Sequence, residues 1–253
     1  MKLLGKIIFS AVVVTSLSWS QTITVAAAAN LKYALADIAK EFKKTSGIDV
    51  KIITGASGKL TQQIMSGAPF DALLSADVEY PAKLAKGGFT TTPAQVYAYG
   101  TLILWSANGA DLSKGVAMLA NPNVKRIAIA NPKTAPYGQE AMNSMRYYKV
   151  DSVAQPKFIN GESINQVATY VTTKAVDVGF MAKSIVYAPD MKNVGKWVEV
   201  NPASYNKIDQ AMVGLKNGSP ENQIATKKFL RFVMSAKAQG ILKNNGYVLP
   251  SEK

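Results

Sequence analysis

The sequence predicts an α/β protein with two lobes, each a mostly parallel β-sheet flanked by helices. Segments typical of strands and of amphipathic helices alternate along the chain after residue 20, which favours parallel strands joined by helices. Asn-Pro and Gly-rich turns separate these segments, and no low-complexity linker interrupts them. With 253 residues, of which 48% are hydrophobic, the chain can bury one large core or two modest ones.

The individual elements are placed by their apolar periodicity and by the residues that end them. Strands are expected at 22–29, 49–54, 71–75, 101–106, 126–130, 156–159, 176–181, 197–200 and 210–215. Helices are expected at 30–46, 57–66, 79–86, 115–120, 138–148, 163–174, 184–188, 220–234 and 236–245. We expect the chain to cross between the lobes near 99–103 and to return near 201–206. The first lobe is therefore predicted to comprise 21–100 and 204–253, and the second lobe 101–203.

Residues 1–20 have the composition of a secretory signal peptide. A short basic stretch precedes an apolar run from Ile7 to Leu17, and Ser18-Trp19-Ser20 has the small-x-small pattern of a cleavage site. The apolar run is too short to span a bilayer, and no later stretch approaches 18 uninterrupted apolar residues. The mature protein is therefore expected to be exported to the periplasm and not to be embedded in a membrane.

The composition excludes several kinds of chemistry. His and Cys are both absent, which removes disulfides, thiolate nucleophiles, His general bases and the usual zinc or iron ligand sets. The formal net charge of +13 comes from 29 Lys and Arg against 16 Asp and Glu. These basic residues are scattered singly or in pairs, so a solvated basic surface is favoured over a nucleic-acid-binding face, and no nucleic-acid partner is expected.

Two strand-to-helix turns share one design. The run from Thr22 to Ala29 leads into Asn30, and the run from Lys51 to Ala56 leads into Ser57. In each turn a small polar residue is expected to cap the helix that follows. The first turn of a helix has free backbone N–H groups and the positive end of the helix dipole. Two such turns from neighbouring strands would converge, so the chain is predicted to bind an anion.

Two further turns extend this argument into the second half of the chain. One leads from Arg126 to Gly138, where Tyr137 offers a backbone N–H and a phenolic donor. In the other, Ser163 and Gln166 have the spacing of a capping box, which places the N–H groups of Ile164 and Asn165 at a helix start. Four helix N-termini, two from each lobe, are expected to face one cleft.

Carboxylates and phosphate loops give weaker signals. Asp71 and Asp77 lie near the end of a strand, but without His or a third ligand a metal or acid–base role is not favoured, and we expect solvated loop positions or hinge contacts. The segment around Ser57 fails the Walker pattern because Ile53 stands where Gly is required and Leu60 stands where Ser or Thr is required. Lys59 is expected to point to solvent.

Two alternative functions remain at this point. An exported hydrolase would use Ser with a Lys base, yet no Ser-x-x-Lys occurs at the proposed site and no Gly-x-Ser-x-Gly elbow is present. The other alternative keeps the fold and binds sulfate, phosphate or an organic acid. A binding site for an organic carboxylate usually contains Arg near the helix starts. Arg occurs only at positions 126, 146 and 231, so none lies at the helix starts of these four turns.

Five short motifs occur in a family's order over residues 22–251. They are Ala-Ala-Ala-Asn30-Leu, Gly-Ala-Ser57-Gly-Lys-Leu, Gly67-Ala-Pro-Phe-Asp71 with Ser75-Ala-Asp77, Asn131-Pro-Lys-Thr-Ala-Pro136-Tyr137-Gly138, and Gly246-Tyr-Val-Leu. On these motifs the chain resembles the periplasmic molybdate-binding proteins of molybdate ABC importers. The resemblance implies a type II periplasmic binding fold that closes on molybdate, or similarly on tungstate, rejects sulfate by size and delivers the oxyanion to a membrane permease. It also implies a monomer that is not an enzyme and has no cofactor.

The resemblance assigns ligand positions residue by residue. Asn30, preceded by Ala29, matches a first cap that is Ser in many relatives, so an amide N–H would replace a hydroxyl donor; Ser57 matches the second hydroxyl ligand. Tyr137 falls where some relatives have Ala, and Ile164 matches an apolar residue whose backbone N–H binds the ligand. The predicted oxyanion site is therefore Ala29, Asn30, Ser57, Tyr137 and Ile164, with no direct metal ligands.

One ligand of some relatives has no counterpart here. A Tyr on a late strand of the second lobe would align with Ala182. We expect the phenol of Tyr137 to supply that donor from the other side. A site of neutral donors suits a buried dianion, because about seven or eight hydrogen bonds and the helix dipoles can spread the charge without a salt bridge.

Overall fold

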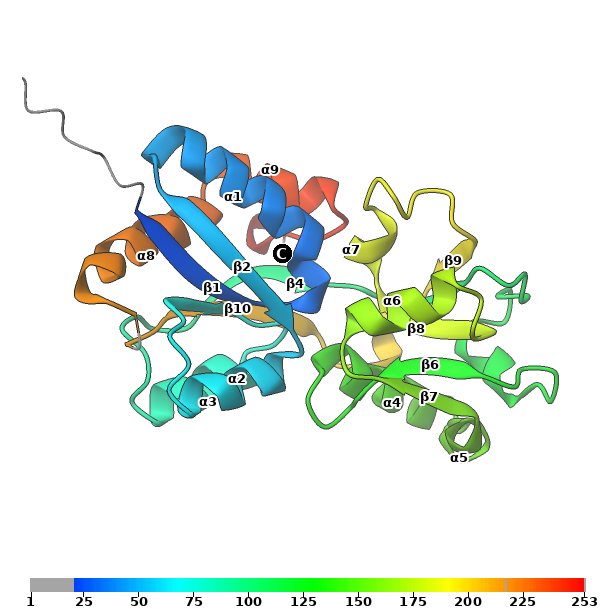
Figure 1. The fold of residues 1–253 in the computed structure, drawn as a ribbon. Coiled ribbons are helices and arrows are strands. Elements are labelled where there is room, and N and C mark those ends of the chain that lie inside the picture. Colours follow the sequence, from blue (N-terminus) through cyan, green and yellow to red (C-terminus); the bar gives the residue numbers. More distant parts are fainter. Residues whose placement is uncertain (1–20, 217, 253) are drawn as a thin grey trace, which may run out of the picture.

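Two five-stranded sheets lie side by side, and helices cover both faces of each (Figure 1). The structure is a computed structural model that describes residues 21–216 and 218–252, so the predicted signal peptide lies outside the described residues. We call each sheet with its helices a lobe. This arrangement confirms the predicted α/β, two-lobed architecture. The domain boundaries given above stay a prediction.

The first sheet has the strand order β2-β1-β3-β10-β4. Its strands are β1 (Thr22–Ala28), β2 (Asp49–Gly55), β3 (Ala72–Leu74), β4 (Gln95–Gly100) and β10 (Ile208–Gly214). β1 pairs in parallel with β2 and β3, whereas β10 is antiparallel to both of its neighbours, β3 and β4. Four strands therefore run in one direction and β10 runs against them. Parallel β1, β2 and β3 end at the same edge, which is where the predicted turns begin.

Helices fill both faces of the first sheet because its strands alternate between two apolar clusters. The first-lobe helices are α1 (Lys32–Ser46), α2 (Ser57–Met65), α3 (Glu79–Lys86), α8 (Pro220–Val233) and α9 (Ala236–Asn244). Ile23 and Val25 of β1 belong to a cluster with α1, α8 and α9, whereas Ala26 belongs to a cluster with α2 and α3. The short helix η5 (Pro250–Glu252) ends the described chain.

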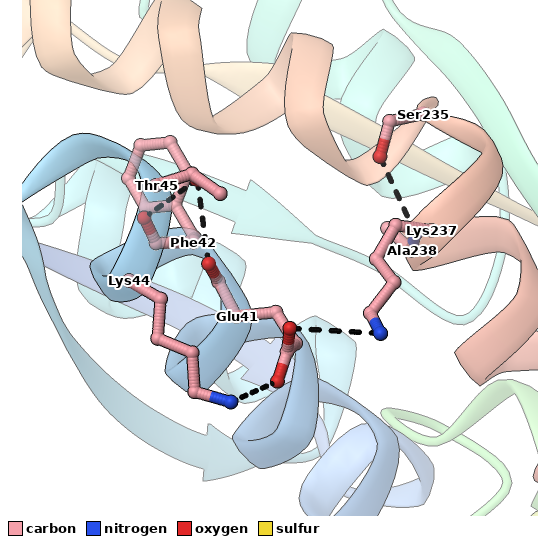
Figure 2. A network of polar contacts seen from close by, with 7 residues as sticks. All are labelled: Glu41, Phe42, Lys44, Thr45, Ser235, Lys237 and Ala238. Carbon is pink, nitrogen blue, oxygen red and sulfur yellow. Dashed lines mark hydrogen bonds and ion pairs between the residues drawn. The ribbon is translucent and has the colours of Figure 1, made fainter.

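A polar network fixes the C-terminal helix α9 to α1 (Figure 2). Glu41 of α1 forms ion pairs with Lys44 over 2.6 Å and with Lys237 of α9 over 3.6 Å. The hydroxyl of Ser235 caps α9 by accepting a hydrogen bond from the N–H of Ala238 over 3.3 Å. The helices α1 and α9, which lie near opposite ends of the described chain, thus pack into one lobe.

The second sheet has the order β7-β6-β8-β5-β9 and repeats the directions of the first. Its strands are β5 (Leu102–Ser106), β6 (Ile127–Ala130), β7 (Phe158–Gly161), β8 (Val178–Ala182) and β9 (Lys196–Glu199). β6 is parallel to β7 and β8, and β5 is antiparallel to β8 and β9. The strand that runs against the others, β5, directly follows a crossing between lobes, as β10 does in the first sheet.

The helices of the second lobe enclose one large apolar cluster with the second sheet. They are η2 (Gly115–Ala120), α4 (Pro136–Tyr147), α5 (Asp151–Ala154), η3 (Gln155–Lys157), α6 (Ile164–Thr172) and α7 (Lys183–Val186), with η4 (Pro202–Ser204) on the return crossing. The first crossing is a single residue, Thr101, between β4 and β5. Two short crossings at one place give the molecule a narrow junction between its lobes.

Most predicted elements are present. β4, the short helix α5 and the 3₁₀ helices η3, η4 and η5 were not expected, and residues 115–120 form a 3₁₀ helix in place of an α-helix. No helix within the described ranges has the length and apolar character needed to cross a bilayer. None of these differences moves the strand-to-helix turns on which the candidate site depends.

Candidate functional site

The four predicted turns meet at one small pocket between the lobes. Ala29, Asn30, Ser57, Tyr137 and Ile164 all line it, and its volume is about 10 Å³. The first three residues belong to the first lobe and the other two to the second. All five are at most 4% exposed, so each of them is buried. A larger cavity of about 980 Å³ lies in the second lobe and contains none of these turns.

Each turn places the start of a helix at the pocket. Asn30 is in the 3₁₀ helix η1 (Ala29–Leu31), Ser57 is the first residue of α2, Tyr137 the second of α4 and Ile164 the first of α6. A first-turn N–H has no acceptor within its own helix, so each position offers a backbone donor and the positive end of a dipole. No charged residue lines the pocket among the residues that the structure describes. The arrangement suits a small anion held by neutral donors.

Ser57 lines the pocket, and its side chain does not cap a helix. Ala56 occupies the cap position, and no side chain caps α2. The prediction that Ser57 caps this helix is therefore wrong. Its hydroxyl oxygen accepts a hydrogen bond from the N–H of Ala76 over 3.0 Å, which leaves the hydroxyl proton free to donate. The residue is 1% exposed, so that proton has little access to solvent.

Asn30 is anchored by its side chain and does not cap α1. The cap position of α1 is Leu31, and that of η1 is Ala28. The amide nitrogen of Asn30 donates to Oε1 of Gln210 over 2.9 Å and to the phenol oxygen of Tyr247 over 2.8 Å. Both amide protons are engaged in this way, so the donor that Asn30 has to spare is its backbone N–H. The role of its side chain toward a ligand stays a prediction.

Tyr137 places its backbone at the pocket and its phenol toward the junction of the lobes. The phenol oxygen accepts a hydrogen bond from Nε2 of Gln210 over 3.1 Å. Burial raises the pKa of Tyr137 well above its ordinary value, so the phenol is neutral. The nearby Gly100 makes room for it, since a Cβ at that position would lie 2.1 Å from the phenol oxygen. Donation from this phenol to a ligand also stays a prediction.

The start of α6 differs from a capping box. Ser163 is at the cap position, but its side chain forms no cap hydrogen bond. Oε1 of Gln166 accepts from the N–H of Glu162 over 2.7 Å, one residue before the position that a capping box requires. The N–H groups of Ile164 and Asn165 are therefore not covered by the Ser163 hydroxyl.

The two carboxylates that the sequence singles out have structural contacts. Asp71, predicted to lie in a solvated loop or at a hinge, is 3% exposed and accepts hydrogen bonds from the N–H of Thr24 over 2.6 Å and from Asn222 over 3.2 Å. Asp77 accepts from the hydroxyl of Ser75 over 2.9 Å, and burial raises its pKa to about 6. Among the described residues, acidic side chains do not gather in threes as a metal site would need.

Contacts between the lobes surround the pocket. The N–H of Gly58 donates to the carbonyl of Thr134 over 2.9 Å, and a Cβ on Gly58 would lie 3.0 Å from Cα of Thr134. Lys59, expected in solvent, forms an ion pair with Glu162 over 3.0 Å, with 42% and 74% of the two side chains exposed. The hydroxyl of Tyr33 donates to Asp190 over 3.1 Å. The lobes are thus closed around the pocket.

Sequence reasoning missed the buried residues that support the site. Gln210, Tyr97 and Tyr247 are each at most 4% exposed, and they hydrogen-bond to site residues or to one another. Gln210 lies 180 positions after Asn30, so no local pattern connects them. The available signal was a Gln directly before the apolar run Ala211–Val213 of a strand, where a buried amide requires partners.

Comparisons with known proteins agree with this geometry. The profile of the bacterial extracellular solute-binding proteins matches residues 23–248. The molybdate-binding protein ModA of Azotobacter vinelandii is 35% identical over 228 residues, which are 90% of each chain. ModA of Rhodobacter capsulatus is 35% identical over 224 residues, 88% of this chain and 86% of the relative. The solved structure of the A. vinelandii periplasmic molybdate-binding protein superimposes with a TM-score of 0.83 at 31% identity, covering 90% of this chain and 99% of that one.

Proposed function

The chain belongs to the family of bacterial extracellular solute-binding proteins, and we propose that it captures molybdate, and similarly tungstate, for delivery to an ABC importer. The observation that carries this proposal is the pocket at which four helix starts from two lobes meet without a charged side chain. The relatives that share this fold at 35% identity bear the name of molybdate-binding proteins.

Neutral donors account for affinity toward a tetrahedral dianion and for selectivity between oxyanions of different size. A tetrahedral dianion placed among the helix starts would receive hydrogen bonds from the backbone N–H groups of Asn30, Ser57, Tyr137 and Ile164 and from the Ser57 hydroxyl. The helix dipoles add favourable potential without the long reach of Lys or Arg. Donors at fixed positions match one size of tetrahedron, so a smaller oxyanion such as sulfate would leave several hydrogen bonds long or unmade.

The protonation state of the ligand adds a second filter. Hydrogen phosphate carries a proton at neutral pH and needs an acceptor for it, whereas the pocket's polar groups are donors. Sulfate and phosphate therefore remain the alternatives against which molybdate must be tested. Catalysis is not part of the proposal, because the relatives are binding proteins and the site has no nucleophile paired with a base.

Closure of the lobes would allow a transporter to distinguish the ligand-bound protein from the free protein. A ligand that contacts helix starts of both lobes stabilises the closed form relative to an open one by its differential contacts. The closed molecule presents a surface to which both lobes contribute in fixed geometry. We propose that a membrane permease recognises this surface and that the exported protein acts as a monomer.

Calorimetric titration tests the proposal. The mature protein, residues 21–253, is freed of ligand and titrated separately with molybdate, tungstate, sulfate and phosphate. We expect one-to-one binding of molybdate and tungstate at least a hundredfold tighter than that of sulfate and phosphate, a difference of about 3 kcal/mol. Preferential binding of sulfate or phosphate would show that the protein has the proposed fold but a different ligand. The absence of binding heat with all four anions would refute the proposed function.

A further inference from the structure

Gln210 is a buried amide that touches site residues of both lobes. It is 0% exposed and lies on β10 of the first sheet. Its Oε1 accepts hydrogen bonds from Asn30 over 2.9 Å and from the hydroxyl of Tyr97 over 2.9 Å, both within the first lobe. Its Nε2 donates to the phenol of Tyr137 over 3.1 Å, and Tyr137 is on α4 of the second lobe. Gln210 itself is not one of the residues that line the pocket.

The local backbone is built to place this side chain at the junction. The pairing of β10 with β4 shifts register between Gln210 and Ala211, and such an irregularity re-aims a side chain. Gly100 ends β4 just before the chain crosses to the second lobe. A Cβ on Gly100 would lie 2.6 Å from Nε2 of Gln210 and 2.1 Å from the phenol oxygen of Tyr137. The hydrogen bond between the lobes therefore needs glycine at this position.

Other polar contacts also join the lobes, and one side-chain bond among them is buried: the hydroxyl of Ser184 in the second lobe donates to the carbonyl of Asn30 over 3.0 Å. Lys59 with Glu162 and Tyr33 with Asp190 are exposed pairs at the rim, where water competes and salt screens. The bond from Gln210 to Tyr137 is shielded from water on both sides. It is also uncharged, so it adds no repulsion to a dianion bound nearby.

We propose that Gln210 is a positioning residue for ligand binding, one that joins Asn30 in the first lobe to Tyr137 in the second only when the lobes close. The inference rests on the proposed function, because it takes the binding of an oxyanion to be the event that closes the lobes. In the open form the phenol of Tyr137 bonds to water, and on closing it exchanges water for Nε2 of Gln210. This bond contributes to affinity and adds nothing to the stability of the ligand-free fold.

Tyr97 provides a matched control. Its hydroxyl bonds to the same amide of Gln210, and also to the carbonyl of Ser75 over 2.9 Å, but every partner is in the first lobe. Tyr97→Phe removes a bond that exists whether the lobes are open or closed. Tyr137→Phe removes the bond between the lobes and keeps the backbone N–H at the pocket.

The test compares Tyr137→Phe, Tyr97→Phe, Gln210→Met and the double variant Gln210→Met with Tyr137→Phe, all as residues 21–253. Molybdate affinity is measured by calorimetry, and thermal unfolding is measured without ligand. We expect Tyr137→Phe to raise Kd about three- to tenfold, the usual range for one neutral hydrogen bond, with an unchanged ligand-free midpoint. Tyr97→Phe should lower the ligand-free midpoint and should raise Kd less than Tyr137→Phe does, because its bond to Gln210 lies within one lobe. Adding Tyr137→Phe to Gln210→Met should cost no further affinity.

Other results overturn the inference and leave the proposed function standing. A ligand-free midpoint that falls equally for Tyr137→Phe and Tyr97→Phe, with unchanged Kd, would show a permanent structural bond. Additive losses in the double variant would show that Tyr137 acts apart from Gln210. If the unmodified protein binds no oxyanion, the proposed function fails, and the ligand-free midpoints of the two Phe variants alone decide whether the bond forms only on closing.

Discussion

The hydroxyl oxygen of Ser57 accepts a hydrogen bond from the backbone N–H of Ala76 over 3.0 Å. Because that N–H occupies one lone pair, the hydroxyl proton is oriented away from Ala76, and the residue lines the pocket between the lobes. The sequence predicts that Ser57 caps a helix, whereas in the structure its contact with Ala76 sets the direction of the hydroxyl proton.

Ser57→Ala should weaken molybdate binding by about 1–3 kcal/mol, because one hydrogen bond to a charged ligand is lost. It should also lower the stability of the ligand-free protein modestly, since the N–H of Ala76 loses its acceptor. Calorimetry and thermal unfolding measure the two effects separately. Ser113→Ala, at an exposed position of the second lobe, is the control and should change neither. An unchanged affinity for Ser57→Ala would remove this hydroxyl from the site.

Gly58→Ala should weaken binding while leaving the isolated lobe intact. Ala is favoured over Gly within a helix by about 1 kcal/mol, so α2 itself gains stability. The added Cβ would lie 3.0 Å from Cα of Thr134 in the second lobe, which obstructs closing, and 2.5 Å from the hydroxyl of Tyr80 in its own lobe, whose side chain has to shift. We expect at least a tenfold loss of molybdate affinity. Gly240→Ala in α9, whose Cβ meets nothing within 4 Å, should leave the affinity unchanged, and equal behaviour of the two variants would argue against obstruction.

The ion pair between Lys59 and Glu162 should contribute little to binding. Both side chains are substantially exposed, and such pairs give about 0.2–1 kcal/mol. A double-mutant cycle with Lys59→Ala and Glu162→Ala, read out as molybdate affinity, measures the coupling between the two residues. The coupling should fall as salt is raised. A coupling above about 2 kcal/mol that salt does not reduce would mean that rim charges, and not neutral donors, hold the closed form.

Asp77 should make the folding stability depend on pH. Burial raises its pKa from 3.8 to about 6, and Glu79 adds to the rise, so the folded state binds a proton more tightly than the unfolded state does. The stabilisation by protonation is complete below pH 4 and is lost as the pH rises through about 6. Asp77→Asn should therefore gain stability relative to the unmodified protein between pH 4 and 7, by up to about 3 kcal/mol. Urea unfolding at intervals over this range measures the difference, which would stay constant if the carboxyl were not desolvated.

The fold was predictable because its signals are local. The strands β1 and β2, the helices that follow them and the turns at Asn30 and Ser57 are each specified by neighbouring residues. β4 was missed because only Thr101 separates it from β5, so no turn marks where one strand ends and the next begins.

The supporting contacts of the site were not predictable because they join distant parts of the chain. The hydroxyl of Ser57 and the amide of Asn30 find their partners in Ala76, Gln210 and Tyr247. Local rules assign such side chains to helix caps, since they cannot include a partner brought near only by the tertiary fold. The positions of the backbone donors were predictable, whereas the directions of the side chains required the structure.

Anomalous diffraction from crystals of the mature protein grown with molybdate tests the central claim most directly. The molybdenum edge locates the metal without reference to any assumed site. We expect one strong anomalous peak in each molecule, in the pocket between the helix starts at Asn30, Ser57, Tyr137 and Ile164, with no Lys or Arg in contact with the ligand. A peak at another place, or a ligand held by charged side chains, would contradict it.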